Sequence, residues 1–218
     1  MNAGLPKQYL MVCGRTLAEH TLRALLAVSR IREVVVALAP GDPHWEDLPA
    51  SLRRRVRVVD GGVERSASVL NGLAGFSGRP DDRDWVLVHD MARACIRASK
   101  IDEMIDALQD DETGGLLAVP VVDTLKRSDE DHRVVATVER ARLWRAQTPQ
   151  MFRYGLLRRA LESAREFGRQ VTDESAAVEA LGLCPRLVPG STDNIKITTP
   201  EDIALAEYYL SQRSGPGT

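Results

Sequence analysis

Short apolar runs alternate with helix-spaced apolar residues along most of the chain. In the segment 16–28 leucines recur at helical intervals, and Thr16 and Glu19 have the spacing of a capping box at its start. The pattern predicts helices at residues 16–28 and 66–76 and from near Lys100, the last with Ser99 and Asp102 as caps. Four β-branched or apolar runs predict buried strands, within residues 33–38, 55–62, 84–90 and 114–122.

This alternation of strand and helix predicts the α/β class, with a mostly parallel sheet and right-handed crossovers. Ligands bind such sheets beyond the carboxyl ends of the strands. The loops at Gly61, Asp90 and Pro120 follow three of the predicted strands. Functional residues are therefore expected in these loops, within one domain that spans residues 1–218.

The carboxyl-terminal part continues the alternation. It predicts two helices, a strand and a short strand around Lys196, at about residues 153–167, 173–181, 185–190 and 194–198. A last helix is opened by Thr199, Pro200 and Asp202 as cap, first position and acidic third position. The tail from Ser211 is expected to be frayed.

Residues 122–152 interrupt this pattern. They hold a polar turn between two short extended pieces and show no helical period, so they predict a protruding hairpin arm. A lone hairpin is marginally stable in water, and this one has few apolar residues. A second copy of the chain is therefore expected to cover it in a homodimer, with a mobile flap as the alternative.

Composition narrows the class of protein. The chain has 218 residues, a net charge of −2 and a pI near 6.1, which offer no general field for nucleic acid. No apolar run is long enough for a signal peptide or a membrane span. Cys13, Cys95 and Cys184 lack the spacing of a zinc site or a disulfide framework. The sequence therefore predicts a cytoplasmic protein with small acidic partners and with neither nucleic acid nor a membrane as partner.

Several charged residues stand where such a sheet binds ligands. Asp90 and Arg93 follow a predicted strand and could form a local ion pair. Alternatively, Asp90 could hold a ribose hydroxyl or a hydrated magnesium ion while Arg93 faces a phosphate. Lys196 lies between two isoleucines and so points to the opposite face, toward either solvent or a ligand. Lys7 follows a proline and Ser68 lies in the first turns of a helix, and each could be an ordinary surface residue.

The order of the motifs around these residues is more specific than any single residue. The motifs are PKQYL, VVDGG with ERSASV, VHDMAR, DTLKR, TPQMF, TDESAAVEALG and DNIKITTPEDIALAE. From Pro6 to about Leu210 the chain resembles the 2-C-methyl-D-erythritol 4-phosphate cytidylyltransferase family. The resemblance implies a Rossmann-like nucleotidyltransferase sheet with magnesium, on which a sugar-alcohol phosphate reacts with CTP and releases pyrophosphate in non-mevalonate isoprenoid biosynthesis. A ribitol 5-phosphate cytidylyltransferase and a catalytically silent dimeric paralogue are the alternatives.

The resemblance also implies roles for individual residues. Lys7 would stabilise the transition state at the α-phosphate, and Lys196 would hold the methylerythritol phosphate for attack. Arg140, on the arm, would reach the substrate phosphate in the neighbouring subunit. Asp90 and Arg93 would line the substrate and ribose side. The other implied contacts are to the substrate from Thr124, Thr148 and Thr172, and to the cytosine from Gly62 and Ser68.

The chain departs from the family pattern at Met91, where a small residue is usual, at Ala94, which replaces a proline, and at Val63, which replaces a commonly acidic residue. The family's sheet also begins with a strand and a glycine-rich loop ahead of PKQYL. Such a loop of backbone N–H groups is a natural cradle for a triphosphate. The chain as printed is therefore expected to bind CTP poorly, and a chain lengthened by that strand and loop is expected to recover activity.

Overall fold

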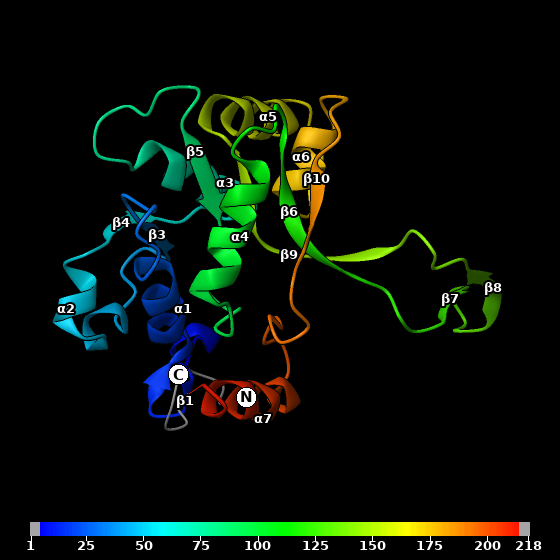
Figure 1. Cartoon of the computed structure of the whole chain (residues 1–218), viewed down its shortest axis with the longest axis horizontal. Helices are drawn as coiled ribbons and strands as arrows, with labels where there is room; N and C mark the ends of the chain where they lie inside the picture. Colours follow the sequence, from blue (N-terminus) through cyan, green and yellow to red (C-terminus); the bar gives the residue numbers. More distant parts are fainter. Residues whose placement is uncertain (1–4, 214–218) are drawn as a thin grey trace.

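The central sheet of the computed structural model, which describes residues 5–213, has four strands (Figure 1). Their order across the sheet is β10 (Arg186–Pro189), β6 (Gly114–Pro120), β9 (Trp144–Arg153) and β5 (Trp85–Val88). β10 pairs parallel to β6, whereas β9 runs antiparallel to both β6 and β5. Three of the four strands therefore share one direction, which confirms the expected α/β class with mostly parallel strands.

A second, two-stranded sheet lies beside β5. In it β3 (Val35–Leu38) pairs parallel to β4 (Arg57–Asp60). A cavity of about 870 Å³, lined by both β3 and β5, separates the two sheets. Within the described residues β3 and β5 each pair with one neighbour, so each has an open edge toward this cavity.

Helices cover both faces of the central sheet. α5 (Tyr154–Glu166) packs on one face and α4 (Ala98–Leu108) on the other. Met151 and Phe152 are consecutive in β9 and both are fully buried, yet they belong to different hydrophobic clusters. Successive side chains of a strand point to opposite faces, so Phe152 packs with α5 and Met151 with α4. β9 is thus the centre of a three-layer core.

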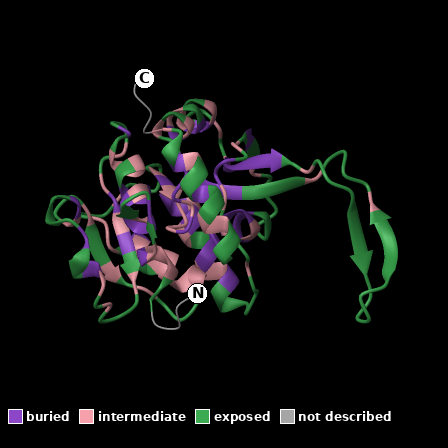
Figure 2. Cartoon of the chain, turned by 90° about the horizontal axis from the view of Figure 1, so that it is seen from below, coloured by how far each residue is buried: buried purple, intermediate pink, exposed green. Residues whose placement is uncertain are grey.

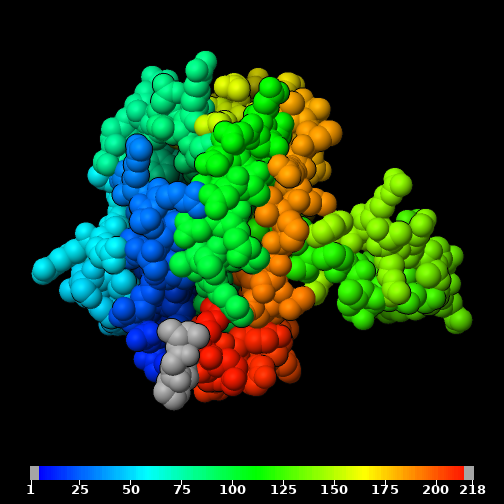
Figure 3. All heavy atoms as spheres, in the orientation of Figure 1, coloured from blue at the N-terminus to red at the C-terminus, as the bar shows by residue number. Residues whose placement is uncertain are grey.

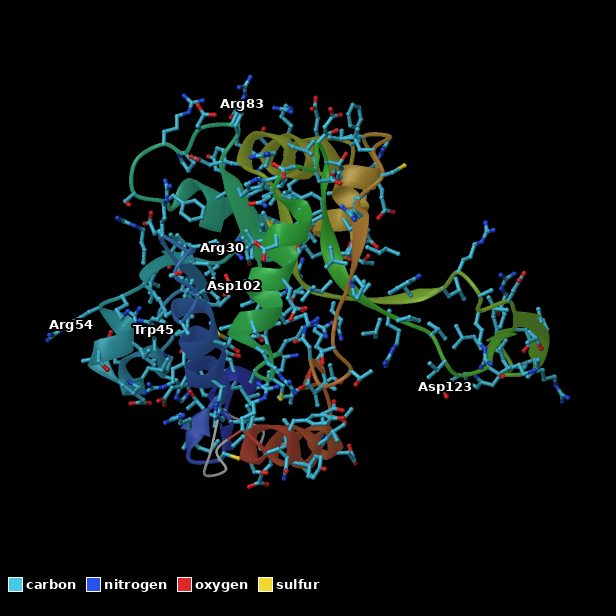
Figure 4. All side chains as sticks on the ribbon, viewed as in Figure 1. Arg30, Trp45, Arg54, Arg83, Asp102 and Asp123 are labelled. Atoms are coloured by element: carbon cyan, nitrogen blue, oxygen red, sulfur yellow. The ribbon has the colours of Figure 1, made fainter. Side chains whose placement is uncertain are left out.

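The terminal helices begin as the sequence predicts. Thr16 accepts the backbone N–H of Glu19 at 3.1 Å at the start of α1 (Leu17–Leu26), and Thr199 and Asp202 form a capping box for α7 (Pro200–Ser211). Figure 4 shows Arg30, after α1, directed at Asp102 of α4, and their Nε and Oδ1 atoms are 3.0 Å apart. The other helical elements and the remaining short strands are η1 (Lys7–Tyr9), β1 (Met11–Val12), β2 (Arg15–Thr16), η2 (Trp45–Asp47), α2 (Ala50–Arg53), α3 (Arg65–Ala74) and α6 (Glu174–Glu179).

The arm projects away from the rest of the molecule (Figures 1 and 3). Its strands, β7 (Leu125–Ser128) and β8 (Val134–Val138), pair antiparallel, and nearly all of their residues are exposed (Figure 2). The expected end of the arm at residue 152 is wrong, because β9 begins at Trp144 and lies within the sheet. Gln147, Thr148 and Gln150 are buried in β9, so its sequence is not the apolar run that indicates a buried strand.

Two local expectations are also wrong. Arg97 is the N-cap of α4, so Ser99 and Asp102 lie inside the helix rather than at its cap. Residues 195–197 form no strand; the backbone N–H of Ile197 donates to the carbonyl of Ala92 at 2.9 Å. Lys196 is therefore presented by an irregular segment that is fixed through its neighbour, because Ile197 is fully buried against α7.

The tail that is expected to be frayed, from Ser211 onward, is described only as far as Arg213. Ser211 still belongs to α7, and Arg213 donates a hydrogen bond to the carbonyl of Cys95 at 2.6 Å. Residues 214–218 lie outside the described residues. The three cysteines are free, and no helix in the described part of the chain is long and apolar enough to cross a membrane.

Candidate active site

Asp90 lies just beyond the carboxyl end of β5, between two cationic side chains. Its Oδ1 atom is 3.0 Å from Nη2 of Arg65, and its Oδ2 atom is 2.9 Å from Nζ of Lys196. Arg65 comes from the start of α3 and Lys196 from the segment before α7. The fold therefore brings three distant parts of the sequence together at one strand end.

The surroundings of Asp90 keep it charged. Burial raises its pKa, but the nearby charge of Arg65 and the hydrogen bond and charge of Lys196 outweigh burial, so the pKa lies below its ordinary value. At neutral pH the site thus holds a carboxylate paired with an ammonium and a guanidinium. The sequence interpretation that paired Asp90 with Arg93 missed both partners.

A hydrogen-bond network fixes the main chain at this strand end. The hydroxyl of Thr148, from β9, accepts the backbone N–H of Asp90 at 3.0 Å and donates to Nδ1 of His89, also at 3.0 Å. Burial lowers the pKa of His89 to about 4, so the ring is neutral at pH 7 and its Nδ1 can accept this bond. Thr148, which the resemblance assigns to the substrate, therefore also positions Asp90.

Arg93 holds the segment that presents Lys196. Its Nη1 donates to the carbonyl of Asn194 at 2.8 Å, and its Nη2 to that of Ala146 at 3.3 Å. Burial lowers the pKa of Arg93 below its ordinary value. The side-chain amide of Asn194 in turn donates to the carbonyl of Thr148 at 2.9 Å. Arg93 thus links the irregular segment to β9 by bonds to backbone oxygens.

The turn between β4 and α3 carries the two expected nucleotide contacts. The N–H of Gly62 donates to the hydroxyl of Ser68 at 3.0 Å, and that hydroxyl donates to the carbonyl of Glu64 at 3.1 Å. A Cβ atom on Gly62 would lie 2.4 Å from the Cβ of Ala67, so the turn requires glycine here. Val63 is fully exposed beside it. The turn is thus rigid and leaves its outer surface open.

Lys7 and Met91 line the same cavity as Ser68, Asp90 and Lys196. Lys7 stands in the short helix η1, which approaches this cavity from the amino-terminal side of α1. Met91 packs against the hydrophobic cluster around α1, and its carbonyl accepts the hydroxyl of Thr21 at 3.0 Å. Ala94 is buried in a separate cluster with Ile197. The structure therefore places two lysines and a carboxylate around one cavity.

The arm residues do not reach this cavity in the single chain. Thr124 and Arg140 are exposed on the arm, which leads away from the sheet (Figure 1). Arg140 donates from Nη1 to the carbonyl of Val122 at the root of the arm. Thr172 is exposed just before α6. Of the predicted residues, the structure thus gathers Lys7, Ser68, Asp90 and Lys196, with Gly62, Arg93 and Thr148 as their supports.

No group of three or more His, Cys, Asp or Glu side chains in the described part of the chain could form a metal cage. Magnesium keeps several waters and is commonly bound through one or two carboxylates together with substrate phosphates. Asp90 is a carboxylate of this kind at the cavity. The residues present therefore fit a hydrated magnesium ion that a bound polyphosphate mainly holds.

An α/β sheet with charged side chains at a strand end, beside a glycine turn that opens a helix, defines a nucleotide-binding α/β protein. The comparisons with known proteins specify the class further. The chain belongs to the 2-C-methyl-D-erythritol 4-phosphate cytidylyltransferase family, whose family model matches residues 1–212. The members of this family are nucleotidyltransferases, which confirms the enzyme class that the motifs predict.

Relatives and solved structures agree with this assignment. The cytidylyltransferase of that name from an Azoarcus species is 51% identical over 99% of this chain and 90% of its own length. The one from Vibrio parahaemolyticus is 49% identical over 99% and 92%. A crystal structure of 4-diphosphocytidyl-2C-methyl-D-erythritol synthase has a TM-score of 0.84 at 37% identity, over 94% of each chain. That of the Thermus thermophilus cytidylyltransferase has a TM-score of 0.81 at 36% identity, over 95% of this chain and 94% of its own.

Proposed function

We propose that this protein joins CTP to 2-C-methyl-D-erythritol 4-phosphate, giving 4-diphosphocytidyl-2-C-methyl-D-erythritol and pyrophosphate. One observation carries the proposal: Lys7, Asp90 and Lys196 line a single cavity beside the glycine turn at Gly62, in a member of the cytidylyltransferase family. Both substrates are anions. A site for them needs cations at one cavity, and Lys7 and Lys196 both line this one.

The chemistry needs positioning more than proton transfer. A phosphate monoester is mostly a dianion at pH 7, since its second pKa is about 6. Its oxygen can therefore attack the α-phosphorus of CTP directly, forming one P–O bond while the bond to the departing pyrophosphate breaks. Two anions must be held in line against their repulsion, and the charge that develops must be stabilised. This agrees with a cavity that holds cations.

Each residue has a part in this reaction. Lys7 stabilises the charge that develops on the α-phosphate, and Lys196 binds the phosphate of the sugar alcohol. Asp90 faces the ribose, and Gly62 and Ser68 face the cytosine from their hydrogen-bonded turn. The exposed Val63 beside them leaves the outer surface of this turn open. Thr148 and Thr172 contact the sugar-alcohol phosphate from the same chain, and Thr124 contacts it from the arm of a second copy. Arg93 lines this side of the site and holds the segment that carries Lys196.

Magnesium is the expected cofactor. When bound with the nucleotide it would offset the negative charge of the triphosphate, and Asp90 is the carboxylate at the cavity that could hold it through water. Lys7 would bind oxygens of the triphosphate that the ion does not contact. The protein acts in the cytoplasm, where CTP is available, and its partners are CTP, the sugar-alcohol phosphate and a second copy of itself.

The homodimer follows from the arm. The exposed residues of β7 and β8 include Leu125, Val134 and Val135, and an isolated two-stranded hairpin is marginally stable. A second copy would cover these side chains and would receive Arg140 at its own cavity. Arg140 therefore completes the site of the partner rather than the site of its own chain.

Substrate choice tests the proposal. Pyrophosphate release is measured with CTP and magnesium and with either methylerythritol phosphate or ribitol 5-phosphate. A higher kcat/KM with methylerythritol phosphate supports the proposal. A higher value with ribitol 5-phosphate would assign the protein to that reaction, and no release with either, from a folded chain that also fails to bind CTP, would make it a silent paralogue.

A further inference from the structure

Arg65 lies between two carboxylates that belong to different parts of the fold. Its Nε and Nη2 atoms are 3.2 and 3.0 Å from Oδ1 of Asp90. On its other side Nη2 is 3.0 Å from Oε2 of Glu174, and Nη1 pairs with Oε1. Arg65 is the first residue of α3 and Glu174 the first of α6, so the guanidinium connects two helix starts to the end of β5.

Glu174 fixes the guanidinium in this place. Its side chain has no exposed surface, whereas that of Arg65 is 36% exposed. A buried carboxylate is costly unless it is paired, and the planar guanidinium can meet both of its oxygens at once. Arg65 therefore cannot turn toward a ligand without leaving a buried negative charge unpaired.

Lys196, the other cation that pairs with Asp90, is not held by a second carboxylate among the described residues, as Arg65 is. Its ammonium is 2.9 Å from Oδ2 of Asp90, and its side chain is 42% exposed. The two oxygens of Asp90 are thus divided between a cation that is locked and a cation that is free to turn. A phosphate that enters the cavity competes for the second cation only.

We propose that Arg65, locked by Glu174, is a positioning residue that holds Asp90 in place when Lys196 leaves it for the phosphate of the sugar alcohol. The inference rests on the proposed function, because that function supplies the phosphate. In the free protein the cations of Arg65 and Lys196 balance the carboxylates of Asp90 and Glu174. When Lys196 turns to the phosphate, Asp90 keeps Arg65 as its partner and so keeps its position beside the nucleotide.

A double variant separates this role from a structural one. Arg65→Gln alone leaves Glu174 buried without its cation and can lose stability for that reason. In Arg65→Gln with Glu174→Gln two amides replace the ion pair and can bond to each other. The matched control is Arg158→Gln with Glu162→Gln, which removes a helix-surface pair on α5 whose atoms are 3.6 Å apart.

Melting temperature and steady-state kinetics are measured for both double variants. The Arg65 and Glu174 variant is expected to melt close to the parent but to lose roughly ten- to hundredfold in kcat, because a misplacement of about 1 Å near reacting groups can cost that much. The KM for CTP should change less. The control should match the parent in both measurements. A Glu174 and Arg65 double variant with the parent's stability and the parent's kcat would overturn the proposal.

Crystal structures give a readout that does not depend on turnover. In the parent soaked with inorganic phosphate, Lys196 should contact the phosphate while Arg65 stays on Asp90. In the double variant soaked with the same phosphate, Lys196 should leave Asp90, and the carboxylate of Asp90, which then has neither cation as a partner, should move from its place in the parent. Arg65 on the phosphate, or an unmoved Asp90 in the variant, would overturn the inference. A parent that releases no pyrophosphate would instead count against the proposed function, and the position of Asp90 would still decide the role of Arg65.

Discussion

The ammonium of Lys196 lies 2.9 Å from the carboxylate of Asp90, although roughly half of the chain separates the two residues. The contact joins the end of a central strand to the irregular segment ahead of the last helix. It also sets the condition for binding, because a substrate phosphate must compete with Asp90 for this cation.

Replacement of Lys196 by alanine should impair the reaction without unfolding the protein. Loss of a cation that faces the reacting phosphate can cost on the order of 3 kcal/mol in transition-state binding, roughly a hundredfold in rate. Loss of a half-exposed charge should change the free energy of unfolding by less than about 0.5 kcal/mol. Kinetics and denaturant unfolding measure the two effects, with Lys100→Ala on the surface of α4 as the control. An unchanged rate would make Lys196 a surface residue.

Mixed dimers should show that two chains share each site. Arg140→Ala chains and Lys196→Ala chains should each be inactive or nearly so. After mixing and subunit exchange, one site in a mixed dimer combines an intact Lys196 with an intact Arg140 from the partner, so part of the activity should return. Mixing Arg140→Ala with itself is the control. Proven mixed dimers that remain inactive would rule out sharing.

The capping box of α7 should stabilise the segment that holds Lys196. The carboxylate of Asp202 accepts the N–H groups of Thr198 and Thr199, both at 2.8 Å, and these bonds lower the pKa of Asp202. Asp202→Ala should therefore lower the free energy of unfolding by about 1 kcal/mol. Ile197 packs on α7, so the rate should also fall.

The same cap should make stability depend on pH. A carboxyl group whose pKa is lower in the folded state than in the unfolded state stabilises the protein above its unfolded pKa. That contribution is lost as the pH falls through the folded pKa. Asp202→Asn keeps an acceptor oxygen without the charge, so its unfolding free energy should lose this acid-range slope. Equal slopes in parent and variant would contradict the role of the cap.

Much of the fold follows from local patterns. The capping boxes at Thr16 and at Thr199 predict the starts of α1 and α7, and the β-branched runs predict β3, β4 and β5. β9 could not be found in this way, because its central position depends on buried Gln147 and Thr148, whose polar groups are satisfied only by distant partners. Local sequence does not encode such partners.

Part of the site could also be predicted from local motifs. Lys7, Asp90 and Lys196 stand in recognisable motifs, and the structure brings them to one cavity. Arg65 and Glu174 were missed, since a charged residue at a helix start looks like ordinary surface. The full burial of Glu174 becomes visible only when α6 packs against the sheet.

The cavity between β3 and β5 leads to a prediction about nucleotide binding. Both strands have an open edge there, so a strand that ends in a glycine-rich loop, added upstream of Met1, should pair with them. The added loop would supply backbone N–H donors for the triphosphate. Calorimetry with CTP and magnesium should show tighter binding by the lengthened chain than by the printed chain. The control carries a proline in the middle of the added strand, which removes a ladder hydrogen bond; equal affinities in all three would contradict the prediction.

Cytidylyl transfer to methylerythritol phosphate can be tested by mass spectrometry of the product. The chain, in its printed and lengthened forms, is incubated with CTP, magnesium and methylerythritol phosphate after circular dichroism has shown that each form is folded. The expected products are 4-diphosphocytidyl-2-C-methyl-D-erythritol and an equal amount of pyrophosphate, formed faster by the lengthened form and roughly a hundredfold more slowly after Lys196→Ala. If neither folded form makes this product, the proposed reaction is wrong.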